Sequence, residues 1–461
     1  MNNLESFLEK KGVEYAPFDP QRVHRIYAVL KPHLEKLYAQ SRESAQADFG
    51  GQNLAKNTQN VFANQHIFGS QKKPFIIHIL GTNGKGSTGR FITLGLAQKG
   101  HKVLHFTSPH LFKFNERFYF ANVLEGVKSS VEKGVDSHNK SSLSALNAKD
   151  SARIAIKTNN ITRIATDSEL ETAHLWLQRF PIVQEASYFE YATFLALYLA
   201  KDCDYFVCEA GLGGEYDSTS VLNADLSIFT PISFDHQDML GDSIKQIATT
   251  KLKAMSKCAL LAPQPFKEVT QIAKNLSKEK GANVTLIDDI FTKNCLPTHF
   301  DTYAKQLAPF LKQNLFSAYK ALESIGVSVD FATLAKFDLP ARAQYITPNI
   351  LVDVGHNVHC AHSILQIVKQ KRVILVYNTF FDKDTKAILG ILKPIIDRLL
   401  ILEVQHSRIL PKRELIGIIQ SLGIKYADFE GMKSIKPNNN YVVFGSFSVV
   451  KTFMEIYDVT R

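Results

Sequence analysis

Cysteine, tryptophan and long apolar stretches are scarce in this sequence. Its 461 residues include five cysteines and one tryptophan. The cysteines are odd in number and none forms a CxxC pair, so the sequence supports neither a disulfide framework nor a zinc ribbon. We therefore expect a protein of the reducing cytoplasm.

No segment is apolar for long enough to cross a bilayer. The longest apolar stretch, residues 194–200, is far shorter than the roughly 20 residues that span a membrane. The N-terminal segment carries Glu5 and Glu9 and lacks the uninterrupted apolar core of a secretory signal. We expect no membrane partner.

The overall composition is that of a globular protein with a basic balance. Apolar residues make up 45% of the chain, aromatic residues 10% and charged residues 21%. Lys and Arg total 54 against 44 Asp and Glu, a net charge of +10. Such a balance suits nucleic acid, an anionic membrane face, or phosphate and carboxylate substrates. Composition does not choose among them.

Predicted strands and helices alternate along most of the chain. After a helical N-terminal segment, residues 3–39, strands are predicted at 74–80, 102–106, 205–209, 226–232 and 259–262, and helices at 90–98, 189–201 and 242–255. A second unit has predicted strands at 350–353, 373–377, 399–404 and 441–444, and helices at 362–369, 385–392 and 412–422. The alternation predicts two α/β domains with mostly parallel sheets: residues 1–335, and a smaller Rossmann-like domain over 336–461.

Residues 121–175 interrupt the alternation. They contain no aromatic residue, although 10% of the whole chain is aromatic, and they are rich in Ser, Asn and Lys. A segment of this composition has little to bury. We predict a flexible surface insertion in the first domain.

A glycine-rich loop over residues 81–88 follows the predicted strand 74–80 and precedes a helix. Glycines allow a close backbone approach, amides at a helix N-terminus bind anions, and Lys85 adds a mobile positive charge. A strict Walker A pattern is absent, because Ile79 replaces its first glycine and Gly86 follows the lysine. The loop still predicts phosphate binding, and thus a P-loop-containing, ATPase-type first domain.

Charged residues also follow two other predicted strands. Glu209 ends one strand, and Asp235 and His236 come shortly after the next. Ligands of α/β folds bind at the carboxyl ends of parallel strands. Glu209 is therefore predicted to bind Mg²⁺ or to orient a water. The Asp235–His236 pair is, by itself, equally compatible with a structural loop histidine.

Nine short segments, taken in order, resemble the folylpolyglutamate synthase/dihydrofolate synthase family of the Mur-ligase group. They are HILGTNGKGST (78–88), FTSPHL (106–111), NERF (115–118), FEYATFLAL (189–197), CEAGLGGEYDST (208–219), FDHQDMLGDSI (234–244), ARAQ (341–344), DVGHN (353–357) and FGSF (444–447). The resemblance implies an ATP-dependent reaction. ATP phosphorylates a carboxylate, and the amine of L-glutamate then displaces phosphate from the acyl phosphate.

The resemblance also implies the residues of the site. The expected ATP-binding residues are Thr82, Asn83, Gly84, Lys85, Gly86, Ser87, Thr88, Asn314, Arg342, Asp353 and His356. One Mg²⁺ would be held by Ser87, Ser108 and Glu209, and a second by His236 and a carbamylated Lys251. The expected catalytic residues are Lys85, His236 and Lys251. Closure of the two domains over ATP would complete the site.

The sequence departs from the family pattern in three places. Glu215 stands where the family usually has Arg, which leaves open any contact with an anionic substrate there, and Ser220 stands where it usually has Asn. The family's common Glu-Lys-x-Gly around the carbamylated lysine is Thr250-Lys251-Leu252-Lys253 here, so a second lysine lies close to the carbamylation position. Residues two apart on a helix point to different faces, which favours Lys251 alone.

We therefore predict a cytoplasmic, monomeric ligase that joins L-glutamate to dihydropteroate or to a folate in folate biosynthesis, with no nucleic-acid partner. Addition of the first glutamate and extension by further glutamates both stay open. One alternative is a Mur-type ligase of cell-wall synthesis, which should have an additional N-terminal domain. The other is a basic nucleic-acid-binding module, which should have a contiguous basic stripe.

Overall fold

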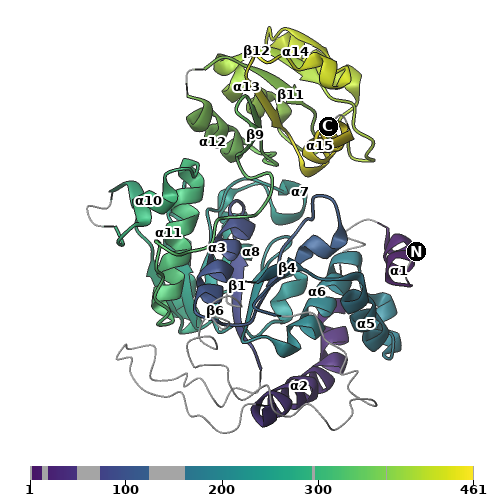
Figure 1. The fold of residues 1–461 in the computed structure, drawn as a ribbon, viewed down its shortest axis with the longest axis vertical. Coiled ribbons are helices and arrows are strands. Elements are labelled where there is room, and N and C mark those ends of the chain that lie inside the picture. Colours follow the sequence, from purple (N-terminus) through teal and green to yellow (C-terminus); the bar gives the residue numbers. More distant parts are fainter. Residues whose placement is uncertain are drawn as a thin grey trace, which may run out of the picture.

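The computed structural model describes residues 3–12, 19–48, 73–123, 161–292, 296–369 and 371–459. These residues form two α/β units, each built around one sheet, with the smaller unit above the larger in Figure 1. None of the described helices is long and apolar enough to cross a membrane.

The sheet of the larger unit has eight strands in the order β4-β3-β2-β5-β1-β6-β7-β8. The strands are β1 (Phe75–Leu80), β2 (Val103–Phe106), β3 (Phe118–Ala121), β4 (Thr162–Ile164), β5 (Tyr205–Glu209), β6 (Leu226–Phe229), β7 (Cys258–Leu261) and β8 (Asn283–Leu286). Six of them are parallel, and β3 and β4 add an antiparallel edge. All residues of β1, β5 and β6 are buried, as expected for a parallel sheet covered on both faces.

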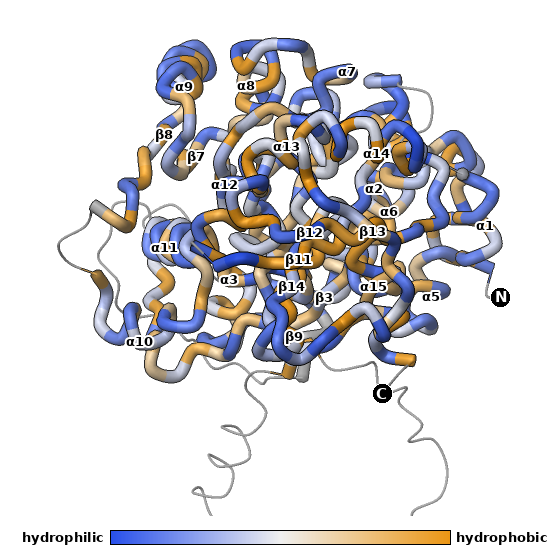
Figure 2. Tube along the Cα trace, turned by 90° about the horizontal axis from the view of Figure 1, so that it is seen from above, coloured by the Kyte–Doolittle hydropathy of each residue, from blue (hydrophilic) through white to orange (hydrophobic). Residues whose placement is uncertain are grey.

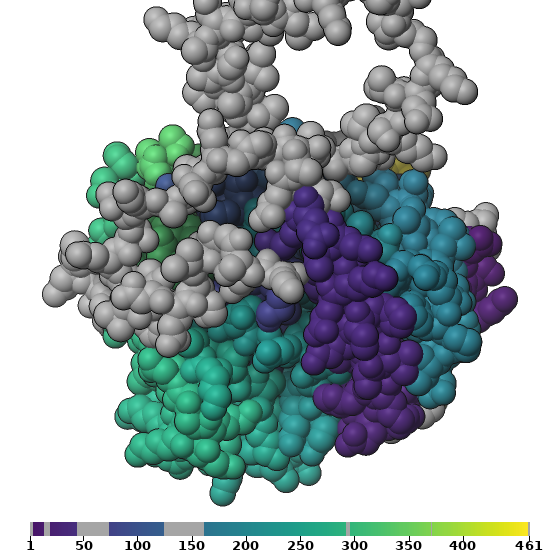
Figure 3. All heavy atoms as spheres, turned by 90° about the horizontal axis from the view of Figure 1, so that it is seen from below, coloured from purple at the N-terminus to yellow at the C-terminus, as the bar shows by residue number. Residues whose placement is uncertain are grey.

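Helices cover both faces of this sheet. Ile76 of β1 packs in the layer of α2 (Arg22–Asp48) and α6 (Tyr188–Leu199), whereas Ile77 and Ile79 pack against α3 (Lys85–Gln98) and α11 (Pro309–Ser324). In Figure 3, α2 forms a purple ridge along one face of the molecule. The remaining α-helices described in this unit are α1 (Asn3–Lys11), α5 (Asp167–Leu177), α7 (Gln237–Leu240), α8 (Ile244–Leu252), α9 (Lys267–Lys280) and α10 (Phe300–Ala304).

The smaller unit has six strands in the order β13-β12-β11-β14-β10-β9. The strands are β9 (Gln344–Thr347), β10 (Ile350–Val352), β11 (Val373–Tyr377), β12 (Ile396–Ile401), β13 (Tyr426–Asp428) and β14 (Tyr441–Phe444). Only β9 pairs antiparallel with its neighbour. The helices α12 (Val358–Val368), α13 (Thr385–Leu392) and α14 (Lys412–Ser421) pack on one face, and α15 (Phe447–Val459) on the other.

Figure 2 shows the apolar strands β11 and β12 lying inside a more polar periphery. The predicted fold class, two α/β units with mostly parallel sheets, is confirmed. The domain boundary that we predicted between residues 335 and 336 falls in the connection between α11 and β9.

The predicted flexible insertion over residues 121–175 is wrong at both ends, because Ala121 belongs to β3 and the last part of the segment is ordered too. β4 pairs with β3, and α5 begins at Asp167. The start of α5 is fixed by a capping box between Thr166 and Glu169, and Arg163 reaches both oxygens of Glu169 at 2.7 Å. The composition misled us because the segment ends just before Trp176, whereas Leu170 and Ala173, at helical spacing, already anchor α5 in the core that Trp176 also contacts. Residues 124–160 of the insertion lie outside the described residues.

Candidate active site between the two units

A cavity of about 650 Å³ lies between the two units. The larger unit contributes the loops that follow β1, β5 and β6, which meet at one edge because neighbouring parallel strands end there. The smaller unit contributes the loops after β10, β11 and β14. All but one of the residues that we predicted for the site line this cavity. They are Thr82, Asn83, Gly84, Lys85, Gly86, Ser87, Ser108, Glu209, His236, Lys251, Asn314, Arg342, Asp353 and His356.

Thr88 is the exception. Its side chain is buried within α3 and does not line the cavity, so the predicted role of Thr88 in ATP binding stays a prediction. One residue earlier in the sequence, Ser87 faces the cavity. The difference follows from the 100° rotation between successive residues of an α-helix, which the motif alone did not resolve.

The glycine-rich loop is held in one conformation by the strand β6 and the helix α11. The amides of Thr82 and Asn83 donate to the carbonyl of Pro231 at 2.9 and 3.2 Å. Gly84 has φ 91°, and a Cβ added there would lie 2.7 Å from Asn314 Oδ1. A glycine is therefore required at position 84, both for the backbone angle and for the space. The loop then enters α3 directly, with the helix N-terminus facing the cavity.

Lys85 lies opposite Glu209 at the floor of the cavity. Its Nζ is 3.8 Å from Glu209 Oε1 and donates to the carbonyl of Thr82 at 3.3 Å. Glu209 is 4% exposed, and its Oε2 accepts hydrogen bonds from the Thr107 hydroxyl and the Ser108 amide. A cation and an anion are thus both present where phosphates would enter, next to the helix N-terminus.

A divalent cation fits this floor. The Ser87 hydroxyl is buried and has no hydrogen-bond partner among the described residues, so an oxygen ligand is left available. The described residues contain no group of three His, Cys, Asp or Glu that could hold a metal by themselves. A hard cation here would therefore take hydroxyl and carboxylate oxygens from the chain and complete its shell with phosphate and water oxygens.

Lys251 reaches the same cavity from α8. The residue is 4% exposed, and burial together with the charge of Lys85 lowers the pKa of its amine to about 7. A large fraction of this amine is therefore neutral at neutral pH, which is the form that reacts with CO₂. Lys253 instead pairs with Glu215 at 2.9 Å, on the exposed surface.

His236 lies beside Lys251 at the start of α7. Its backbone is left-handed, with φ 51°. Burial, with the charges of Lys383, His356 and Lys251, lowers its pKa to about 3 against the opposing effect of Asp235. The imidazole is therefore neutral near pH 7, the state in which a histidine binds metals.

The smaller unit places Arg342 and Asp353 across the cavity from Lys85. The guanidinium of Arg342 lies 4.9 Å from the ring centroid of Phe447, and burial lowers the pKa of Arg342. Both neighbours of Arg342, Ala341 and Ala343, have left-handed backbones with φ 54° and 47°. Asp353 stabilises this turn by accepting from the amide of Ala343 at 2.7 Å.

Sequence reasoning missed several cavity residues of the smaller unit. Lys383 and Arg408 line the cavity but were not predicted, nor was Asn357, which contacts Asp235. Asp235 of the larger unit was noted without a specific role. Residues 382–384, in the loop that follows β11, contain the charged cluster that could have identified Lys383. Charged residues there lie at the carboxyl edge of the second sheet, where loops face the first unit.

Comparisons with known proteins agree with this arrangement. No family model matches the chain. The crystal structure of Helicobacter pylori folylpolyglutamate synthetase is 36% identical, with a TM-score of 0.64, and the similarity covers 100% of this chain and 99% of that one. Escherichia coli FolC in complex with ADP is 25% identical, with a TM-score of 0.66 over 84% of this chain and 90% of that one. The curated dihydrofolate synthase/folylpolyglutamate synthase of Escherichia coli K12 is 27% identical, over 84% of this chain and 88% of its own length.

A glycine-rich phosphate loop on one α/β unit, closed by charged groups of a second unit, defines the protein as an ATP-dependent ligase. With 36% identity along the whole chain to the Helicobacter pylori enzyme, the protein belongs to the folylpolyglutamate synthase/dihydrofolate synthase family. The family that the motifs predicted is thus confirmed. Neither a Mur-type cell-wall ligase nor a nucleic-acid-binding module is named among these relatives.

Proposed function

We propose that this protein uses ATP to join L-glutamate to the carboxylate of dihydropteroate or of a folate. The observation that supports this most directly is the meeting of Lys85, Glu209 and Lys251 in one cavity whose other wall carries Arg342. The names of the Escherichia coli and Helicobacter pylori relatives support these two acceptors, and the ADP bound to the Escherichia coli protein supports the nucleotide.

The first step activates the acceptor. An oxygen of the acceptor carboxylate attacks the γ-phosphorus of ATP, the bond to the β–γ bridging oxygen breaks, and ADP leaves. The protein positions the reactants and neutralises their charge. Lys85 and the loop amides bind the β and γ phosphates, and Arg342 approaches the phosphates from the other unit. The carboxylate oxygen of the acceptor, a poor leaving group, becomes part of an acyl phosphate, from which phosphate can leave.

The second step forms the amide. The amine of L-glutamate attacks the acyl carbon, and inorganic phosphate departs as the C–N bond forms. Water in the cavity would hydrolyse the acyl phosphate, so closure of the two units over the reactants protects it. The SPHL segment assists closure, because Leu111 of the larger unit is buried in the apolar core of the smaller unit.

Two divalent-cation sites complete the proposal. Ser87, Ser108 and Glu209 would hold one Mg²⁺, and His236 with carbamylated Lys251 the other. Bound there, the cations supply positive charge that stabilises the developing charge on the phosphate oxygens. The neutral imidazole of His236 and the depressed pKa of Lys251 support the second site, because both side chains have the protonation states that these roles need.

The remaining ATP contacts come from both units. We propose that Asn314 lies near the base, since the buried Nδ2 of this residue has no hydrogen-bond partner among the described residues. Asp353 and His356 would lie near the ribose. Because one chain supplies both walls of the site, we propose a monomer, which sedimentation of the purified protein would test. We also propose a cytoplasmic location, as the few unpaired cysteines predict.

One assay tests the function. ADP release would be measured with the full-length protein, ATP, Mg²⁺ and L-glutamate, with either dihydropteroate or a reduced folate as acceptor. We expect release with at least one acceptor, dependent on glutamate, and a product heavier by one glutamate residue in mass spectrometry. Lys85→Ala serves as the inactive control. No release with either acceptor would disprove the proposed function.

A further inference from the structure

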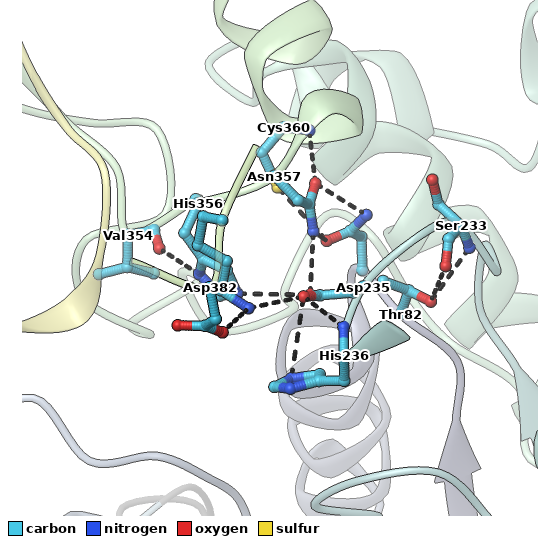
Figure 4. Close-up of polar contacts among 12 residues, drawn as sticks. Thr82, Ser233, Asp235, His236, Val354, His356, Asn357, Cys360 and Asp382 are labelled. Carbon is cyan, nitrogen blue, oxygen red and sulfur yellow. Dashed lines mark hydrogen bonds and ion pairs between the residues drawn. The ribbon is translucent and has the colours of Figure 1, made fainter. Parts of the chain in front are cut away.

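Three side chains of the smaller unit converge on a single carboxylate of the larger unit. Lys383 Nζ lies 2.7 Å from Asp235 Oδ1, and His356 Nε2 and Asn357 Nδ2 lie 3.4 and 3.3 Å from Asp235 Oδ2. Figure 4 shows Asp235 at the centre of this group, with His236 below it. Asp235 is therefore one point at which polar groups of the two units meet.

The ion pair between Asp235 and Lys383 is almost completely buried. The side chains of Lys383 and Asp235 are 5% and 8% exposed. Burial by itself raises the pKa of Asp235, but the hydrogen bond from His356 and the nearby charges outweigh it and hold the pKa well below its usual value. Removing one partner of such a pair leaves the other charge buried without compensation, which is strongly unfavourable.

Asp235 is connected rigidly to the phosphate loop. Its loop is held by Ser233, whose amide donates to Thr82 Oγ1 at 3.0 Å. Asn357 bridges the same elements from the other unit, because its Nδ2 also donates to Asn83 Oδ1 at 2.9 Å. The contact with Asp235 therefore sets the distance between the phosphate loop and the residues of the smaller unit that face it.

Lys383 has a second carboxylate within its own unit. Its Nζ lies 3.2 Å from Asp382 Oδ2, which Arg408 also contacts at 2.8 Å. If the units separate, Lys383 keeps Asp382 as a partner, and Asp235 keeps the hydrogen bond that the backbone amide of His236 donates to its Oδ1 at 3.0 Å. Neither charged group is then left without a polar partner, so the contact between the units can break without the full cost of an unpaired buried charge.

We propose that Asp235 and Lys383 are positioning residues that hold the two units closed over the nucleotide. Their ion pair forms when the units close and brings Arg342 and His356 to the phosphate loop. On opening, Lys383 is retained by Asp382. The proposal rests on nucleotide binding in the cavity, which the proposed function requires, but it does not depend on the identity of the acceptor.

The test compares this pair with an exposed pair of the same length. Asp235→Asn, Lys383→Met and the double variant would be examined beside Lys412→Met and Asp428→Asn. Lys412 and Asp428 are also 2.7 Å apart, but they are 57% and 60% exposed and both belong to the smaller unit. Binding of the ATP analogue AMPPNP with Mg²⁺ would be measured by calorimetry, and compaction on AMPPNP binding by small-angle X-ray scattering.

We expect each single variant at the buried pair to weaken AMPPNP binding by at least about tenfold and to lose part of the compaction. The double variant should bind within about threefold of the weaker single variant, because the two substitutions remove one interaction. Lys383→Arg keeps the charge and should recover most of the affinity. The exposed-pair variants should stay within about twofold of the unmodified protein.

Wild-type affinity and wild-type compaction in the double variant would overturn the proposal. A lower Tm with both readouts unchanged would also overturn it, since the pair would then be a folding contact only. If a single variant fails to fold, the double variant decides, because it leaves no unpaired charge. Both readouts are independent of ADP release, so a failure of the ligase assay is distinguishable from a failure of this inference.

Discussion

Lys251 and Lys253 lie two residues apart in opposite surroundings. Lys251 is 4% exposed beside the phosphate loop, whereas Lys253 lies on the surface with Glu215 at 2.9 Å. Glu215 and Lys253 both differ from the residues usual in the family, and they form an ion pair with each other. This pairing favours Lys251 over Lys253 for the proposed carbamylation, because an exposed, paired ammonium stays protonated.

Replacement of these two lysines should therefore have unequal effects. We expect Lys251→Ala to lower kcat for ADP release by at least about 100-fold, because the proposed second cation would lose its anionic ligand. Lys253→Ala should leave kcat within about twofold, since an exposed ion pair contributes little. Steady-state kinetics on both variants decide the matter, and the opposite ranking would assign the carbamate to Lys253.

Carbamylation of Lys251 should depend on pH in a defined direction. Its pKa is lowered to about 7, so the reactive neutral amine increases as pH rises through 7. At a fixed pressure of ¹³C-labelled CO₂, we expect the carbamate signal in ¹³C NMR to grow between about pH 6 and pH 8. The signal should be absent from Lys251→Ala and present in Lys253→Ala. A signal that requires pH above about 9 would show an ordinary, unperturbed lysine.

Lys85→Ala should abolish ATP turnover while the protein stays folded. The substitution removes the cation that faces the phosphates, an electrostatic contribution of at least about 100-fold in kcat. Lys99, at the exposed end of the same helix, provides the control, and Lys99→Ala should keep full activity. Circular dichroism establishes folding, and substantial turnover by a folded Lys85→Ala protein would contradict the assignment of the phosphate loop.

Gly84→Ala should damage the site, whereas Gly100→Ala should not. Both glycines have positive φ, at 91° and 81°, so an alanine meets similar backbone strain at either position. Only at position 84 would the new methyl group clash, at 2.7 Å from Asn314 Oδ1; at position 100 nothing described lies within 4 Å. We expect Gly84→Ala to weaken AMPPNP binding by at least about tenfold. Equal affinities of the two variants would show that the contact with Asn314 is unimportant.

The local sequence was sufficient to predict the elements whose conformation depends on neighbouring residues. The apolar, β-branched run of β1 and the glycines after it predicted a strand and a phosphate loop, and both lie where expected. Edge elements were missed, because β8, β9 and β13 are short and carry exposed residues, which gives them a weak alternating pattern. α5 was missed because the surrounding composition suggested a flexible insertion.

The sequence by itself determined the family, the phosphate loop and most residues that line the cavity, because each of these is carried by a short motif. Only the tertiary structure placed Lys251 in the cavity and Lys253 on the surface, kept Thr88 out of the cavity lining and brought Lys383 to Asp235. These outcomes depend on burial and on contacts between residues far apart in the chain. Asp235 and Lys383 are separated by 148 positions, and no local pattern encodes which distant charge will neutralise a buried carboxylate.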